Sequence, residues 1–244
     1  MENLDKMTWQ EMKNNSEKLK TFYLSQIESF FDEFENLAKE NYEEVIQDYL
    51  IEHNFLFDIF SNNSLIFSKH KLADAFIPDF ILFGNERWCN SIRPTVTFIE
   101  IERADLKLFT SKGIPSSYLT HAINQAQNWK EWLQDNREYF HKQLMKKIEE
   151  FSKLSISVEF NDMLLRNLIH GFREQYAIII GRRSSLTINN RLMLERLNKD
   201  YQDIRIITFD TLFTDKLDHN KSVILSSAWT TSDIRKSENA FVVK

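Results

Sequence analysis

The chain has 244 residues, a formal net charge of -5 and a hydrophobic fraction of 42%, with only four Gly and three Pro. This length fits one large domain or a domain with an extension, and the apolar content is enough for a sizeable core. The scarcity of Gly and Pro argues against long disordered linkers. The acidic balance excludes a generic polycation that coats nucleic acid, but it leaves room for a local basic groove.

Cysteine use and apolar patterning bear on where the protein works. Cys89 is the only cysteine, which excludes an intramolecular disulfide and a cysteine cluster for zinc. A reducing, intracellular compartment is therefore expected. The N-terminus lacks the basic and apolar regions of a secretory signal, and no apolar stretch approaches the roughly 20 residues that a membrane span needs. These features predict a cytoplasmic protein with no membrane partner.

Residues 7–40 are predicted to form a helix, because apolar residues recur there at helical spacing. The aromatic run Phe30-Phe31-Asp32-Glu33-Phe34 is unusual for a solvent-facing helix. It either packs on the rest of the domain or forms an oligomer contact, and the sequence alone favours neither alternative.

A second helix is expected to begin after Asn41, which is a plausible N-cap. Glu43 and Glu44 occupy its first turn, where the helix dipole favours acids. Glu44 or Glu52 could reach a metal site if this helix abuts the ends of strands. For either residue alone, an ordinary surface acid is the better interpretation.

Apolar runs predict strands at residues 65–67 and 76–83, with loop segments after them at 85–87 and 90–91. Asp79 enters the second strand directly after Pro78. An acid is a poor strand former, so its position there needs a reason.

The strongest strand signal covers residues 95–102, which are largely β-branched or aromatic. Alternation places Phe98, Glu100 and Glu102 on one face and the residues between them on the other. The two glutamates are therefore about 6.5–7 Å apart along the strand, close enough to influence one ion-binding site.

A loop that carries Lys107 and Lys112 is predicted to precede a helix opened by Pro115-Ser116-Ser117, with a serine as its N-cap. His121 and Gln125 stand at i and i+4 in this helix and share one face.

The rest of the chain alternates helices and strands. The preceding helix is expected to continue as a charged helix at 135–151. The expected order after it is a buried strand at 176–181, a helix at 190–198, a strand at 204–209, and a helix at 211–217 capped by Asp210. Together with the first half, this order predicts an α/β fold with a mixed central sheet flanked by helices.

The acids at the ends of two predicted strands suggest a cation site. Burying Asp79, Glu100 and Glu102 is costly unless a divalent cation compensates their charge. One or two Mg²⁺ ions held by carboxylates would neutralise a phosphodiester and make a water nucleophilic. The alternative is a set of surface acids on a solvated strand face. The pair Glu100 and Glu102 alone would favour surface acids. The additional acid Asp79, which follows Pro78 in a separate apolar strand, favours a cation site.

Two further groups could assist phosphodiester chemistry. His121 could protonate the leaving oxygen or hold a phosphate, and Gln125 could orient the water or a ligand. The alternative for this pair is a helix face hydrogen-bonded to nearby loops.

Arg182 and Arg183 follow a strand end, where α/β sheets bind ligands. They could contact a nucleic-acid backbone, and a solvated basic turn is an equal alternative.

The order of these motifs resembles known nucleases. Pro78-Asp79 followed by Glu100-Ile101-Glu102 is similar to the PD-(D/E)xK nuclease pattern. More narrowly, residues 45–218 resemble the Shedu antiphage nuclease domain. The segments that carry this resemblance are Phe98 to Asp105, Leu108-Phe109-Thr110-Ser111-Lys112-Gly113, Tyr118-Leu119-Thr120-His121-Ala122-Ile123-Asn124-Gln125, Trp129-Lys130-Glu131-Trp132, Ile180-Gly181-Arg182-Arg183-Ser184-Ser185-Leu186 and Ile207-Thr208-Phe209-Asp210-Thr211-Leu212.

The resemblance implies a restriction-endonuclease-like core and metal-dependent DNA cleavage in bacterial defence against phage, with Mg²⁺ or Mn²⁺ as cofactor. Asp79 and Glu100 would be metal ligands, with the Ile101 carbonyl as a third. The PD-(D/E)xK pattern places a lysine where this chain has Glu102. Glu102 would then be a further metal ligand or a general base.

The resemblance also implies roles for the neighbouring polar residues. Lys107 or His121 would supply the positive charge of the missing lysine, and His121 is preferred because its helix should lie against the sheet. Gln125 resembles a helix glutamine found in several branches of these nucleases. The expected partner is DNA, in particular phage double-stranded DNA, with four backbone contacts: Lys107, Lys112, Arg182 and Arg183.

Three regions follow from the resemblance: an N-terminal helical extension at 1–40, a nuclease domain at 41–220 and a C-terminal extension at 221–244. Proteins of this family tend to form homo-oligomers, which favours an oligomer contact at residues 30–37. Because Glu102 replaces a lysine, a catalytically inactive DNA-binding or assembly module that retains the fold is the alternative function. A protein-interaction subunit built on the N-terminal helix is a weaker alternative.

Overall fold

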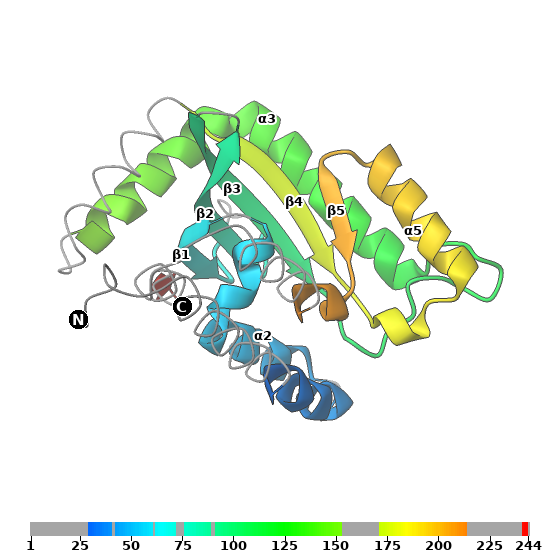
Figure 1. Cartoon of the computed structure of the whole chain (residues 1–244). Helices are drawn as coiled ribbons and strands as arrows, with labels where there is room; N and C mark the ends of the chain where they lie inside the picture. Colours follow the sequence, from blue (N-terminus) through cyan, green and yellow to red (C-terminus); the bar gives the residue numbers. More distant parts are fainter. Residues whose placement is uncertain are drawn as a thin grey trace, which may run out of the picture.

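The computed structural model describes residues 29–40, 42–60, 62–71, 76–88, 91–152, 171–213 and 241–243. These residues form a six-stranded sheet in the order β5-β4-β3-β2-β1-β6, with helices on both faces (Figure 1). The α/β architecture predicted from the sequence, a mixed central sheet flanked by helices, is therefore confirmed. It is consistent with a nuclease-like fold.

Antiparallel and parallel strands meet at β3, which makes the sheet mixed. β1 (Asn62–Ser68), β2 (Phe80–Trp88) and β3 (Ser91–Ile101) are antiparallel neighbours. β4 (Arg173–Ile179) and β5 (Ile204–Ile207) run parallel to β3, and the helices α3 (Ser117–Ser152) and α5 (Ile188–Asp200) connect them. β6 (Phe241–Val243) pairs in parallel with β1. Part of the C-terminal segment therefore belongs to the sheet.

The hairpin of β2 and β3 is longer than the sequence indicated. The prediction of loops at 85–87 and 90–91 is wrong for residues 85–87 and for Ser91, which pair across the hairpin. Ladder hydrogen bonds between the two strands outweigh the turn preference of the polar residues there. At its other end, β2 begins at Phe80 rather than at Phe76.

One face of the sheet packs against α3 and α5. Phe98 of β3 and Tyr176 of β4 stack with ring centroids 5.4 Å apart, and Trp129 and Phe140 of α3 are buried against this layer. Each buried aromatic ring of this kind contributes a few kcal/mol to the stability of the fold. The strand alternation that buries Phe98 therefore fixes which face of β3 meets α3.

α3 is one long element, and residues 135–151 continue the helix that begins at Ser117, as the sequence indicated. Ser116 is its N-cap, because its Oγ accepts a hydrogen bond from the N–H of Leu119 (3.3 Å), as the sequence predicted. The helix is kinked at Asn136, whose φ and ψ are -119° and 19°. The Asn136 side-chain amide donates to the carbonyl of Trp132 (2.9 Å), which satisfies a carbonyl that the kink frees.

The other face of the sheet packs against α2 (Glu43–Glu52), the 3-10 segments η2 (Ala38–Glu40) and η3 (Asn54–Ile59), and the helical residues 29–37 and 209–213. Phe34 is fully buried there, with ring centroids 5.2 Å from Phe209 and 5.4 Å from Phe213. Of the two alternatives for the aromatic run, packing on the domain is therefore confirmed for Phe34. Residues 7–28 and the proposed cap Asn41 lie outside the described residues.

No helix within the described ranges combines the length and the apolar character that crossing a membrane requires.

Candidate active site

Asp79 is fixed against the end of β3 by backbone contacts. It lies directly before β2 and is 9% exposed. Its Oδ2 accepts a hydrogen bond from the N–H of Ile101 (2.7 Å), and its carbonyl accepts one from the N–H of Lys69 (2.8 Å). Because Phe80 pairs with Ile99, the hairpin register places Asp79 beside the last residues of β3.

Glu100 and Glu102 lie at the same end of the sheet. Glu100 is the penultimate residue of β3, and Glu102 follows the strand, where its N–H donates to the carbonyl of Ile179 in β4 (2.9 Å). Phe98 packs in the core under α3, and Ile99 packs on the opposite face. The predicted alternation is therefore confirmed for Phe98 and Ile99, and Glu100 shares the face of Phe98 that meets α3. The prediction that the strand extends to Glu102 is wrong, because β3 ends at Ile101.

α2 brings two further polar side chains to Asp79. Gln47 is 4% exposed, and its Nε2 donates to Asp79 Oδ1 (2.8 Å) and to Glu43 Oε1 (2.9 Å). Glu43 and Gln47 stand at i and i+4, so they lie on one face of α2. Figure 1 shows α2 at the end of the sheet toward which β3 and β4 point. Glu43, Asp79, Glu100 and Glu102 are called the acidic cluster below.

Glu43 and Gln47 were not predicted as site residues from the sequence. Glu44 and Glu52, the acids of this helix that could have reached a metal, are both exposed. The i, i+4 spacing of Glu43 and Gln47 was the available signal. The same spacing is common on solvent-exposed helices. Only the packing of α2 against the strand ends places these two side chains next to Asp79.

Three members of the acidic cluster, Asp79, Glu100 and Glu102, have raised pKa values. Burial, and then the charges of Asp79 and Glu102, raise the pKa of Glu100 to about 9. Burial, followed by Glu43 and Asp79, raises the pKa of Glu102 to about 7. Burial raises the pKa of Asp79 to about 6 despite the backbone hydrogen bond that it accepts. Three acids in this environment are stabilised by protons or by a cation.

Gln125 links α3 to the cluster, whereas His121 lies at the surface. A side-chain hydrogen bond from Gln125 lowers the pKa of Glu100, against the larger effect of burial. The Gln125 Oε1 is buried and has no hydrogen-bond partner among the described residues. His121 is one turn earlier on α3 and is exposed. The structure therefore brings Gln125, but not His121, into contact with a predicted metal ligand.

The chemistry of the acidic cluster fits a hard divalent cation. Within the described ranges, no three His, Cys, Asp or Glu side chains form a ready-made metal site. The cluster nevertheless offers oxygen donors alone, and Mg²⁺ and Mn²⁺ prefer carboxylate, carbonyl and water oxygens. The raised pKa values show that its negative charge is not fully compensated by the protein. The unpartnered Gln125 Oε1 adds an acceptor that a metal-bound water could satisfy.

The four predicted DNA contacts have different environments. Lys107, Lys112 and Arg183 are exposed. Arg182 is held within the fold by Glu35 and by both oxygens of Asp210 (3.1 Å each), and its guanidinium lies over the rings of Phe31 and Phe34 (5.5 Å to each centroid). Arg182 therefore ties the N-terminal helical residues to the end of β4.

The prediction that Asp210 caps a helix is wrong, although residues 211–213 of the predicted helix are helical and residues 214–217 lie outside the described residues. Residue 210 is itself helical, within the segment 209–213, and its carboxylate also accepts a hydrogen bond from the N–H of Arg183 (2.6 Å). A bidentate ion pair with an arginine guanidinium is stronger than a single cap bond to a backbone N–H, so the distant partner prevails over the local one.

Gly181 positions the loop that carries Lys107. Its φ is +61°, and a Cβ there would lie 2.4 Å from the carbonyl oxygen of Leu106 and 2.6 Å from Leu108 Cδ1. Gly181→Ala is expected to lower the free energy of unfolding by about 1–3 kcal/mol, as measured by urea denaturation. Gly113→Ala is the matched control, because its φ is +75° but nothing lies within 4 Å of its Cβ. Equal losses in the two variants would contradict the close contact at Gly181.

The acidic cluster, α3 and the Arg182-Arg183 turn all fall within one family match. No curated protein matches the chain. The model of the family described as "Shedu protein SduA, C-terminal" matches residues 40–213, more than half of the sequence, and the chain therefore belongs to the Shedu family.

Proposed function

We propose that this chain is a metal-dependent DNA endonuclease of antiphage defence that hydrolyses phosphodiester bonds at the acidic cluster. Membership of the Shedu family suggests antiphage defence. The observation that carries the nuclease proposal is the convergence of Asp79, Glu100 and Glu102, with raised pKa values, at one end of the sheet. These carboxylates can be ionised together near neutral pH when a cation compensates their repulsion.

Asp79 and Glu100 are the proposed ligands of Mg²⁺ or Mn²⁺, with the Ile101 carbonyl and Glu102 as further oxygen donors. The ion would neutralise charge on the scissile phosphate and lower the pKa of a bound water. Gln47 and the N–H of Ile101 hold the two oxygens of Asp79 in fixed directions. The Asp79 carboxylate is thus oriented before any ion binds, which reduces the cost of binding.

As the alternative to binding the ion, Glu102 would take the proton of the attacking water. Its pKa of about 7 lies near the operating pH, where a general base is most effective. It stands where the PD-(D/E)xK pattern has a lysine, so this chain would use a base at that position. The exposed His121 would give a proton to the leaving oxygen, and Gln125 would orient Glu100 through its hydrogen bond.

Exposed basic residues are the proposed contacts to the DNA backbone, with phage double-stranded DNA as the substrate: Lys107, Lys112 and Arg183. Arg182 would support this surface from within. We place the enzyme in the cytoplasm as a homo-oligomer. Since Phe34 packs on its own domain, the oligomer contact would use other surfaces, and the mass of the purified protein by sedimentation tests the oligomer.

Incubating the purified protein with supercoiled and linear duplex DNA tests the proposed activity. Cleavage is expected with Mg²⁺ or Mn²⁺ and should stop when EDTA removes the metal. Cleavage that persists in EDTA would contradict the metal dependence, and intact DNA under all metal conditions would contradict the nuclease.

A DNA-binding or assembly module without catalytic activity is the second candidate. Glu102 in place of a lysine is the observation that favours it. Calorimetry separates the two: absence of Mg²⁺ and Mn²⁺ binding, together with salt-dependent DNA binding, would favour the inactive module.

Glu43 is expected to strengthen metal binding from α2. Its negative charge raises the pKa of both Asp79 and Glu102, so it contributes to the negative potential that would attract the cation. Glu43→Gln should weaken Mn²⁺ binding by about 10-fold in a calorimetric titration. Glu44→Gln is the matched control, since Glu44 is exposed in the same turn. A Glu43→Gln protein that binds Mn²⁺ with the affinity of the parent would show that Glu43 does not contribute to metal binding.

A further inference from the structure

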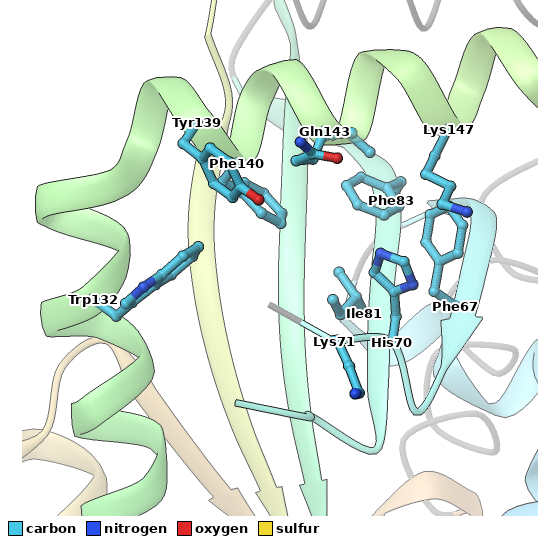
Figure 2. Close-up of a pocket in the computed structure, with 11 residues that line it drawn as sticks. Phe67, His70, Lys71, Ile81, Phe83, Trp132, Tyr139, Phe140, Gln143 and Lys147 are labelled. Carbon is cyan, nitrogen blue, oxygen red and sulfur yellow. The ribbon is translucent and has the colours of Figure 1, made fainter. Parts of the chain in front are cut away.

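A pocket of about 230 Å³ opens between α3 and the strands β1 and β2 (Figure 2). α3 contributes the aromatic side chains of Trp132, Tyr139 and Phe140, and the strands contribute Phe67 and Phe83. Trp132 and Tyr139 have ring centroids 6.4 Å apart in an edge-to-face arrangement, and Tyr139 is 46% exposed. Apolar rings therefore form much of the wall, and part of that aromatic surface is open to solvent.

The polar lining of the pocket is basic. It consists of His70, Lys71, Gln143 and Lys147, and none of the 11 lining residues is acidic although the whole chain carries a net charge of -5. Burial, followed by the charge of Lys147, lowers the pKa of His70. The neutral imidazole offers one donor and one acceptor, and the lysines provide the positive charge. Flat apolar walls with a basic rim fit a planar ring that carries an anionic group.

The same two elements carry the pocket and the acidic cluster. Ile81 of the pocket is two residues after Asp79, and Trp132 is seven residues after Gln125 on α3. Seven residues of helix span about 10 Å, which is the axial rise of about three base pairs. A DNA strand held at the acidic cluster can therefore reach the pocket within a few nucleotides.

We propose that this pocket binds one unstacked nucleotide of the DNA strand that is held at the acidic cluster. The base would lie against Trp132 and Tyr139, and Lys71 and Lys147 would contact the adjoining phosphate. The pocket is smaller than the about 300 Å³ at which pockets for drug-sized ligands begin, so it would hold the base alone, with the sugar and phosphate at its mouth. Stacking on aromatic rings accepts any base, so the pocket would read the presence of an unpaired base rather than its identity. This inference rests on the proposed nuclease function.

Binding to two duplexes in EDTA tests the inference without cleavage. One duplex carries a single unpaired 2-aminopurine and the other, of the same length, is fully paired. Tyr139→Ala is expected to weaken binding of the unpaired-base duplex by about 5- to 100-fold, as measured by anisotropy, and to leave the paired duplex unchanged. Lys71→Gln should also weaken binding of the unpaired-base duplex. Tyr139→Phe, which keeps the ring, should retain the affinity of the parent.

Lys142→Gln is the matched control for charge. Lys142 is exposed on α3, pairs with Glu138 (2.7 Å) and does not line the pocket, so its loss should not discriminate between the duplexes. Tyr139→Ala and Lys71→Gln proteins that bind both duplexes like the parent would overturn the pocket assignment. A free deoxynucleoside monophosphate that competes as strongly as the unpaired-base duplex would assign the pocket to a small molecule and overturn it too.

Different results would contradict the nucleotide pocket and the nuclease activity. A parent protein that cleaves DNA with Mg²⁺, but whose pocket variants bind both duplexes unchanged, contradicts the pocket alone. A parent protein that neither binds nor cleaves DNA when Mg²⁺ is present contradicts both proposals.

Discussion

Glu100→Gln is expected to lower the rate of DNA cleavage by about 100- to 10,000-fold while leaving the protein at least as stable as the parent at pH 7. The amide keeps the shape of the carboxyl but cannot carry the negative charge that a metal ligand needs. With a pKa of about 9, Glu100 is already neutral at pH 7 in the folded, metal-free protein. Replacing it by a neutral amide therefore costs the metal-free fold little.

Cleavage rates with Mg²⁺ and urea denaturation without metal measure the two halves of this prediction. Glu131→Gln is the control, because Glu131 is an exposed acid on α3. A Glu100→Gln protein that cleaves DNA at the rate of the parent would exclude Glu100 as a ligand. A variant that loses activity together with its stability would instead indicate a structural role for this carboxyl.

Without metal, the protein is expected to lose stability as the pH rises from about 4 to 9, by on the order of 3 kcal/mol or more. Folding raises the pKa of Asp79 to about 6, of Glu102 to about 7 and of Glu100 to about 9. An acid with a raised pKa contributes its stability below the pKa of the unfolded chain. That contribution disappears as the pH passes through the folded pKa, because the folded protein resists losing the proton.

Saturating Mg²⁺ should remove most of this loss, since a cation that binds the folded state alone stabilises it by about 2.7 kcal/mol at 100 times its Kd. Urea midpoints from pH 5 to pH 9, with EDTA and with Mg²⁺, measure both effects. Glu100→Gln should flatten the metal-free profile between pH 7 and 9, where Glu100 dominates. Metal-free stability that increases over this range would show that the acids are not destabilised by one another.

The local pattern was sufficient for the strands that carry the acidic cluster. The period of two in β3 predicted the face of Glu100, and the core position of Phe98 bears it out. The serine cap before α3 and the order of strands and helices were likewise readable, because each depends on neighbours in sequence. Pro78-Asp79 indicated a special position, although β2 itself begins one residue later.

Features that depend on distant partners could not be predicted. Gln47 matters because it contacts Asp79, 32 residues away, and no helical pattern encodes that contact. Asp210 was expected to cap the helix that follows it, but its carboxylate binds Arg182, 28 residues away. The aromatic residue Phe34 fits an oligomer interface or a core equally well until Phe209 and Phe213 are placed against it.

Asp79 and Glu100 are proposed to hold a divalent cation, and the anomalous signal of crystals soaked in Mn²⁺ tests this most directly. We expect a peak within about 2.5 Å of a carboxylate oxygen of each residue. Crystals in which Mn²⁺ saturates other sites but leaves no peak between Asp79 and Glu100 would contradict it.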